Sequence, residues 1–273
     1  MTITFIGGGN MADALIGGLL RKKISPAKLR VVEIDPEARS RLEKKYQIKC
    51  FDDTAKAKIK IDEDVVVFAV KPQHMEEAAR SSGLRANANL VISIAAGIRL
   101  NSLSRWLNGH KHLVRAMPNT PAVIGAGITG LYSFAEVTEK EKSQADKILQ
   151  AVGSTVWIKE EAQLDAVTAI SGSGPAYVFY FMEAIERAAQ ELRLPPEIAI
   201  KLVLETFNGA TQLATYTSDP IAKLRERVTS KGGTTECAIT RLESLHVTEA
   251  IVEAVKAANN RARELGEQFD RGK

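Results

Sequence analysis

The sequence predicts an α/β protein in which a parallel, doubly wound β-sheet is followed by an all-helical region. Three observations support this fold class. Short runs rich in Val and Ile alternate with helical patterns over about the first 160 residues, as in strand–helix–strand units. A glycine-rich turn follows the first of these runs. From Ala162 onward the strand patterns stop, and apolar residues recur at helical spacing.

The predicted strands are short, apolar and bounded by Gly, Pro, Asn or Asp. They are Ile3–Gly7, Leu29–Ile34, Asp64–Val70, Asn89–Ala96, His112–Met117, Gly127–Ser133 and Ser154–Glu160. Helical patterns at 11–22, 36–46 and 138–152 lie between them. Because a helical crossover brings the next strand back parallel, the alternation of strands and helices in the first half indicates a parallel, doubly wound sheet. The runs at 127–133 and 154–160 are two further predicted strands.

The second part contains two long helical patterns. Their apolar residues lie at 178, 181, 182, 185, 189 and 192, and then at 200, 203, 204 and 207. Helices with such wide apolar faces need more than one neighbour, so we expect burial in a homodimer. A compact monomeric bundle is the alternative. We place the domain boundary between a first domain, 1–161, and a helical domain, 162–273.

Composition argues against several classes of protein. The chain has 273 residues, a net charge of +4 and only 5% aromatic residues, so it lacks the basic and aromatic clusters of nucleic-acid-binding proteins. The two cysteines, Cys50 and Cys237, form no metal-binding motif. No apolar run approaches the ~20 residues of a membrane span. We expect a cytoplasmic protein without a metal, nucleic-acid or membrane partner.

The glycine-rich turn has the G-x-G-x-x-A pattern of a dinucleotide-binding, Rossmann-type domain. Gly7 would permit the tight turn, Gly9 the close approach of a pyrophosphate, and Ala12 close packing of helix on strand. The helix N-terminus would bind the phosphates. The alternative is a glycine-rich turn without a ligand. The predicted cofactor contacts here are Ile6, Gly7, Gly8, Gly9, Asn10, Met11 and Ala12.

Asp35 follows the second predicted strand, 26 residues after Gly9. An acidic residue in this region can bond the adenosine ribose and favour NADH, because a 2′-phosphate would meet a like charge. Arg39 and Arg41 lie close enough in sequence to offset that charge. Asp35 can instead cap the helix that begins at Pro36. Both interpretations remain open.

Further cofactor contacts are predicted where later strands end, since open α/β sheets bind ligands at the carboxyl ends of their strands. The residues are Ala69, Val70, Lys71, Pro72, Ala95, Ala96 and Asn119. Lys71 could equally be a surface lysine without a role. Asn119, in "MPNTP", could bond the nicotinamide amide or only shape its turn.

Two clusters of glycines and hydroxyl residues precede helices in the second part. They are "SGSGP" (171–175) and "VTSKGGTTE" (228–236). Helix N-termini with free N–H groups bind carboxylates. Glu236 is interpreted as a first-turn acid, with direct substrate binding as the alternative.

Six motifs in this order, "FIGGGNMA", "AVKPQ", "SIAAG", "RAMPNTPA", "SGSGPAYVF" and "VTSKGGTTE", resemble the pyrroline-5-carboxylate reductase family from Ile3 to about Ala258. The resemblance implies reduction of the C=N bond of Δ1-pyrroline-5-carboxylate to L-proline by NADH or NADPH, the last step of proline biosynthesis. It implies a homodimer interlocked through the C-terminal helices and, in many members, a decamer.

The resemblance also implies the residues of the substrate site. Binding falls on Ser230, Gly233, Thr234 and Thr235, with Thr235 beside the ring nitrogen as the catalytic residue. Family members commonly carry Ser, Thr or Asn just after the second strand, where this chain has Asp35. The choice between NADPH and NADH is therefore open.

This reaction fits a site made of hydroxyl and backbone N–H groups. A protonated imine is already electrophilic, and the cofactor supplies the hydride, so little acid–base catalysis is required. The histidines, His74, His110, His112 and His246, are expected to be structural or exposed.

Two other functions remain open from the residues. A β-hydroxyacid dehydrogenase would need a lysine, for which Lys201 and Lys231 are the candidates. A dinucleotide-binding regulator without turnover would have no use for "SKGGTT".

Overall fold

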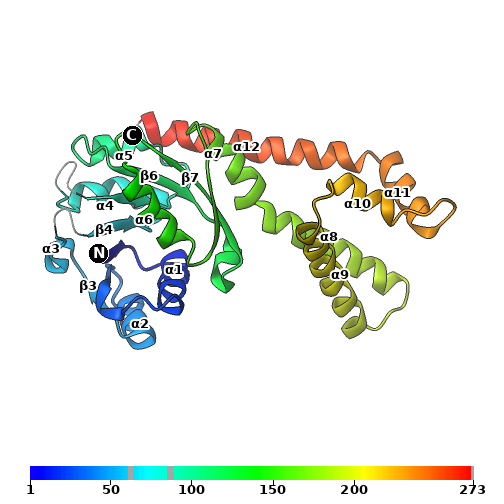
Figure 1. Ribbon diagram of the computed structural model, residues 1–273, viewed down its shortest axis with the longest axis horizontal. Helices are drawn as coiled ribbons and strands as arrows, with labels where there is room; N and C mark the ends of the chain where they lie inside the picture. The colour runs from blue at the N-terminus through cyan, green and yellow to red at the C-terminus, as the bar shows by residue number, and fades with distance from the viewer. Residues whose placement is uncertain (61–63, 85–88, 272–273) are drawn as a thin grey trace. The chain divides into compact units, whose positions relative to one another are not determined.

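The computed structural model describes residues 1–60, 64–84 and 89–271, which form two compact units (Figure 1). The first unit comprises Met1–Ser173 and Ala258–Lys273, and the second comprises Gly174–Ala257. The first contains the sheet, and the second is helical throughout its regular elements. The predicted fold class, a doubly wound sheet followed by a helical region, is confirmed.

The sheet has eight strands in the described part of the chain, in the order β3-β2-β1-β4-β5-β6-β7-β8. They are β1 (Ile3–Ile6), β2 (Leu29–Val32), β3 (Lys49–Phe51), β4 (Val65–Phe68), β5 (Val91–Ser93), β6 (Leu113–Met117), β7 (Gly127–Ser133) and β8 (Gly153–Trp157). The strand β3 is not among the predicted strands, because it is only three residues long and carries a lysine and a cysteine.

Strand direction agrees with the prediction from β1 to β6, which pair in parallel. The last two strands, whose direction was not predicted, depart from this pattern: β7 runs antiparallel to β6, and β8 runs parallel to β7. Only a short 3-10 turn, η3 (Thr120–Ile124), connects β6 to β7. A parallel return needs a crossover of about a dozen residues or more, so this connection reverses the chain.

Helices cover both faces of the sheet because its strands are apolar on both sides. On one face, Ile3, Phe5 and other buried strand residues pack with three helices: α1 (Asn10–Arg21), α2 (Pro36–Tyr46) and α6 (Glu139–Leu149). Ile6, Phe68 and others on the opposite face pack with α4 (Met75–Ser81), α5 (Leu100–Trp106) and Phe269 of α12 (Val247–Arg271). The remaining short elements of this unit are η1 (Pro26–Lys28), α3 (Thr54–Ala57), η2 (Pro72–His74), α7 (Gln163–Val167) and a π-helical turn, η4 (Thr168–Gly172).

A buried ionic network joins the segment after β8 to the sheet. Arg115 on β6 bonds Glu161 at 3.1 Å, and Arg99 bonds Asp165 at 2.5 Å. Burial lowers the pKa of Arg115 below its usual value, although Glu161 and Asp165 oppose that change. Breaking such a buried pair leaves one charge without its partner, which costs several kcal/mol.

The helical unit contains α8 (Gly174–Glu191), α9 (Pro196–Tyr216), α10 (Ile221–Arg227), α11 (Thr234–Ser244) and the first part of α12. Its described residues include only two buried apolar side chains, Ala199 and Val203. Many large apolar residues are instead exposed, among them Phe179, Tyr180, Leu192, Leu202, Leu204, Leu213, Leu242 and Ile251. Exposed apolar area on this scale is typical of a protein interface.

Among the described residues, no helix combines the length and the apolar character that a membrane crossing requires. The same residues contain no group of three or more His, Cys, Asp or Glu side chains placed to hold a metal ion.

Close packing of α1 leads to the first testable prediction. A Cβ atom on Gly18 would lie 2.3 Å from the carbonyl oxygen of Ala151, which belongs to the backbone. We expect G18A to lower the free energy of unfolding by about 2–4 kcal/mol through overpacking. Thermal and urea denaturation measure the change.

The matched control is G17A on the same helix. Its methyl group would meet the Tyr46 hydroxyl at 3.0 Å, and the end of that side chain can shift. Alanine also favours the helix by about 1 kcal/mol over glycine. Equal stabilities of G18A and G17A would contradict the packing described here.

Candidate active site

The glycine-rich loop after β1 adopts a conformation that only glycine accommodates. Gly7 has φ +100, and a Cβ there would lie 2.7 Å from the carbonyl oxygen of Ala69. Its N–H bonds Val32 O at 2.8 Å, which extends the β1–β2 pairing by one residue. The loop is therefore held directly between the ends of β2 and β4.

The N-terminus of α1 is open beside this loop. Gly9 is the N-cap and has no side-chain hydrogen bond to the helix, and a Cβ on it would meet no atom within 4 Å. Ala12 is completely buried, so the first turn packs closely on the sheet, whereas Asn10 is exposed and Met11 half-buried. Free N–H groups next to open space at a helix N-terminus suit a phosphate, so these residues fit a dinucleotide.

The other predicted cofactor residues lie at the carboxyl edge, meaning the edge of the sheet where β1, β2, β4, β5 and β6 end. Ile6 is the last residue of β1, and Ala69 N bonds its carbonyl oxygen at 2.8 Å. Ala69 and Val70 are half-buried, and Lys71 is exposed just before Pro72 in η2. After β5, Ala95 is buried and Ala96 is exposed. Since β1, β4 and β5 are neighbours in the sheet, their loops share one edge.

Asn119 follows β6 and is nearly buried. Its amide nitrogen donates to Ser171 O at 3.0 Å, and its amide oxygen accepts from Ile128 N at 2.9 Å. These bonds tie the "MPNTP" turn to β7 and to η4, so Asn119 does shape the turn. Its predicted contact with the nicotinamide stays a prediction.

Asp35 caps α2. Its carboxylate accepts from Glu37 N at 3.1 Å, and Pro36 occupies the first helical position. A second carboxylate, that of Glu33, lies closer to the glycine loop and accepts from Gly8 N at 2.7 Å. Glu33 is not among the predicted site residues because the predicted strand, Leu29–Ile34, includes it, whereas β2 ends at Val32.

The predicted substrate residues lie around the N-terminus of α11, in the helical unit. Gly232 has φ +73, and Gly233 is the N-cap, without a side-chain bond to the helix. The carboxylate of Glu236 accepts from Gly232 N at 2.6 Å, which holds the turn in place. Ser230 and Thr234 are exposed and Thr235 is half-exposed. The arrangement offers hydroxyl groups and first-turn N–H groups to an anion.

The "SGSGP" cluster does more than cap a helix. Its first residues belong to the π-helical turn η4, in which Ser171 Oγ donates to Val167 O at 3.0 Å. A Cβ on Gly172 would lie 2.7 Å from the Met117 side chain. This glycine therefore allows η4 to pack against the end of β6.

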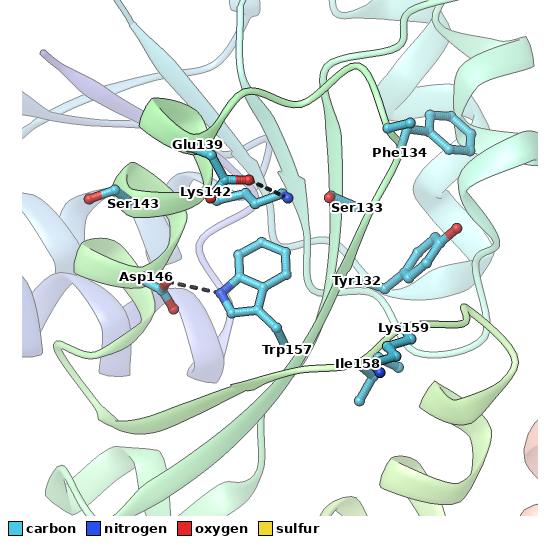
Figure 2. A pocket seen from close by; sticks show the side chains of 11 residues that line it. Tyr132, Ser133, Phe134, Glu139, Lys142, Ser143, Asp146, Trp157, Ile158 and Lys159 are labelled. Atoms are coloured by element: carbon cyan, nitrogen blue, oxygen red, sulfur yellow. Dashed lines mark hydrogen bonds and ion pairs between the residues drawn. The ribbon is translucent and has the colours of Figure 1, made fainter.

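Figure 2 shows a different hollow, of about 530 Å³, lined by Tyr132, Phe134, Lys142, Trp157 and their neighbours. Because β7 is antiparallel, Ser133 pairs with Val114 near the start of β6, so the hollow lies away from the carboxyl edge. Two pairs of its polar side chains bind each other: Trp157 Nε1 donates to Asp146 at 2.9 Å, and Lys142 pairs with Glu139 at 2.7 Å (Figure 2). It is not the candidate site.

The histidines lie as expected. His74 and His246 are exposed, His110 is buried, and His112 Nδ1 pairs with Glu141 at 2.8 Å. His74 ends η2, in the connection that follows β4 at the carboxyl edge, whereas the other three histidines lie outside the loops of that edge and outside the turn before α11.

A doubly wound sheet with an open glycine loop defines a dinucleotide-binding protein, and the comparisons with known proteins place it among the NAD(P)-dependent oxidoreductases. A family model described as an NADP oxidoreductase, coenzyme F420-dependent, matches residues 2–97. A second model, described as pyrroline-5-carboxylate reductase dimerisation, matches residues 161–265.

Comparison with individual relatives identifies the family to which the chain belongs. The pyrroline-5-carboxylate reductase of Pseudomonas aeruginosa is 42% identical over 98% of this chain and 97% of its own length. The solved structure of a Coxiella burnetii pyrroline-5-carboxylate reductase has a TM-score of 0.89 at 38% identity and covers 97% of this chain and 98% of its own.

A Plasmodium falciparum pyrroline carboxylate reductase, solved with NADP bound, has a TM-score of 0.85 at 27% identity, with coverage of 97% and 98%. The chain belongs to the pyrroline-5-carboxylate reductase family. The predicted family, NAD(P)H as its cofactor, and the reductive step of proline biosynthesis are thereby confirmed.

The open N-terminus of α1 leads to a prediction about binding. Because a Cβ on Gly9 meets no protein atom within 4 Å, we expect G9A to fold with unchanged melting temperature. The same methyl group would occupy the space that a pyrophosphate needs, so the Kd for NADH and NADPH should rise at least about tenfold, or ~1.4 kcal/mol. Titration calorimetry and thermal denaturation measure the two quantities.

G7A provides the contrast, since its methyl group would collide with the chain's own backbone and lower the melting temperature as well. Unaltered dinucleotide binding in folded G9A would mean that the phosphates bind elsewhere.

Proposed function

We propose that this chain reduces Δ1-pyrroline-5-carboxylate with the turn before α11 as its substrate site and Thr235 as its catalytic residue. The substrate carboxylate is bound by Ser230, Gly233 and Thr234. The observation that carries this proposal is the geometry of the turn. It combines a left-handed Gly232, an N-cap without a side-chain bond at Gly233, and two threonines in the first helical turn.

The cofactor binds at the carboxyl edge of the first unit. The phosphates lie on the N-terminus of α1, and the loops after β4 and β5 line the rest of the cofactor. When bound, the nicotinamide supplies the hydride that the imine carbon accepts. The protein's part is to bind and orient, and orientation alone can lower a barrier by about 7–11 kcal/mol.

Thr235 acts on the nitrogen end of the imine. Its hydroxyl donates a hydrogen bond to the ring nitrogen of the neutral imine, and it can pass on a proton from water to that nitrogen as the hydride is added to the carbon. Since the product amine is basic, no strong acid is needed. Glu236 serves the site indirectly, because its carboxylate already accepts the Gly232 N–H and so holds the turn that presents the threonines.

The hydroxyacid dehydrogenase is not favoured. Its lysine candidates are Lys201, exposed on α9, and Lys231, exposed in the turn before α11. Identity of 42% over nearly the whole chain to a pyrroline-5-carboxylate reductase supports the imine substrate instead.

The proposed assembly is a homodimer formed through the exposed apolar residues of α8 to α12, with a decamer as its higher form. The match of the family's dimerisation model to residues 161–265 supports the dimer, and it also supports a functional boundary near 161. We further propose that the protein acts in the cytoplasm. Sedimentation or light scattering of the purified protein gives the number of subunits.

The direct test of the reaction is oxidation of NADH and NADPH, followed at 340 nm with and without DL-pyrroline-5-carboxylate. Turnover that depends on this substrate supports the proposal. Dinucleotide binding by folded protein without turnover would favour the regulator or another substrate.

Thr235 is tested by removing its hydroxyl. We expect T235A to lower kcat at least about 100-fold, the size of effect typical of a positioned proton-transfer group, and to leave the Kd for the cofactor unchanged. T235S keeps the hydroxyl and is expected to retain most of the activity. T234A should mainly raise KM. An unchanged kcat in T235A would remove Thr235 from the mechanism.

A further inference from the structure

We propose that Glu33, rather than Asp35, selects the cofactor, and that it makes this chain prefer NADH to NADPH. This inference rests on the proposed NAD(P)H-dependent function and deepens it by naming the residue that distinguishes the two dinucleotides.

Glu33 occupies the position from which an acidic residue reaches the adenosine ribose. It is the first residue after β2, and β2 pairs in parallel with β1, with Ile6 opposite Val32. The end of β2 therefore lies directly beside the glycine loop that follows β1. In dinucleotide-binding sheets of this type, the ribose next to that loop is bound by an acid at the end of the second strand.

The carboxylate of Glu33 faces the glycine loop. Its Oε2 accepts from Gly8 N at 2.7 Å, and its Oε1 accepts from Asp35 N at 2.9 Å. A Cβ built on Gly8 would lie 3.3 Å from Oε2. These two bonds fix the carboxylate against the loop while the residue stays half-buried, so it can also accept from a ribose hydroxyl.

Asp35 is not placed in the same way. Its carboxylate bonds the N–H of Glu37 at the start of α2, and the residue is exposed. The hydrogen bonds of Asp35 and Glu33 thus divide the roles: Asp35 caps the helix, and Glu33 lies on the glycine loop.

Two arginines lie nearby, and an arginine at this place can favour NADPH by binding its 2′-phosphate. Both, however, already bond the backbone. Arg39 Nη1 donates to the carbonyl oxygens of Glu33 and Ile34 at 2.6 and 2.8 Å. Arg41 Nη2 donates to Gly8 O at 3.3 Å. Both guanidinium groups are engaged with backbone, whereas Glu33 lies on the loop itself. A 2′-phosphate would bring further negative charge next to this carboxylate, and like charges this close repel.

The surface beside Glu33 also suits an adenosine. Ile34 follows it in sequence and is 84% exposed. An apolar side chain in that place can pack against the adenine ring, which removes apolar area from water on binding.

The test uses ligands that carry only the adenosine half of the cofactor. The Kd values of ADP-ribose and 2′-phospho-ADP-ribose are measured by calorimetry on the full-length protein, together with those of NADH and NADPH. We expect the wild type to bind ADP-ribose at least about tenfold more tightly than its 2′-phosphorylated form. E33Q keeps an acceptor for Gly8 N but loses the charge, and it should reduce this ratio about tenfold or more.

D35N is the matched control. It removes the same charge two residues away, and asparagine is as good an N-cap as aspartate, so the ratio should stay at the wild-type value. E33S, which removes the carboxylate without adding an amide, repeats the test if E33Q melts at a lower temperature.

Three results would overturn the inference: a wild type that prefers the 2′-phosphorylated ligand, a ratio unchanged in both Glu33 variants, or an equal change in D35N. Failure to bind any of these ligands would also overturn the cofactor assignment on which it rests. The expected ratios in a protein that fails to reduce pyrroline-5-carboxylate would support the role of Glu33 and refute only the proposed reaction.

Discussion

The pairing of β1 with β2 on one side and β4 on the other is the constraint on which the candidate cofactor site depends. Ile6 lies opposite Val32 and Phe68, so all three strands end at the same level. The pairing continues beyond the strands, through Gly7 N to Val32 O and Ala69 N to Ile6 O. The backbone of Gly7 lies so close to Ala69, in the loop after β4, that any side chain on Gly7 would collide with it. The open N-terminus of α1 is a consequence, since the chain enters that helix directly from the loop.

The two units share one structural feature at their proposed ligand sites. In each, a glycine N-cap without a side-chain bond, Gly9 or Gly233, begins a helix whose first N–H groups can bind an anion. The helix α1 lies on a sheet with an extensive buried core, whereas α11 belongs to a unit with few buried apolar residues of its own. The proposed substrate site would therefore depend on dimerisation for its rigidity, while the cofactor site is supported by its own unit.

Local sequence signals predicted the elements that are stabilised locally. The helix 36–46 was predicted with its observed bounds because Asp35 and Pro36 mark its start and the pattern ends at Tyr46. Strand ends were predicted too long, as at Asn89–Ala96, because the apolar run continues into the loop that lines the carboxyl edge. The reversed direction of β7 and the short strand β3 depend on neighbouring strands rather than on their own residues.

The sequence by itself determined the fold class, the family, the glycine loop and the threonine-rich turn, because each depends on residue types at short, regular spacing. Which acidic residue faces the glycine loop depends on the tertiary structure. Glu33 and Gly8 are 25 residues apart, and their hydrogen bond exists only because β1 and β2 pair in one register. The partners of the Asn119 amide also depend on the tertiary structure. Its nitrogen donates to Ser171 O, 52 residues away, and its oxygen accepts from Ile128 N, nine residues away. Spacing along the chain carries no record of such contacts, since they arise from the packing of distant segments.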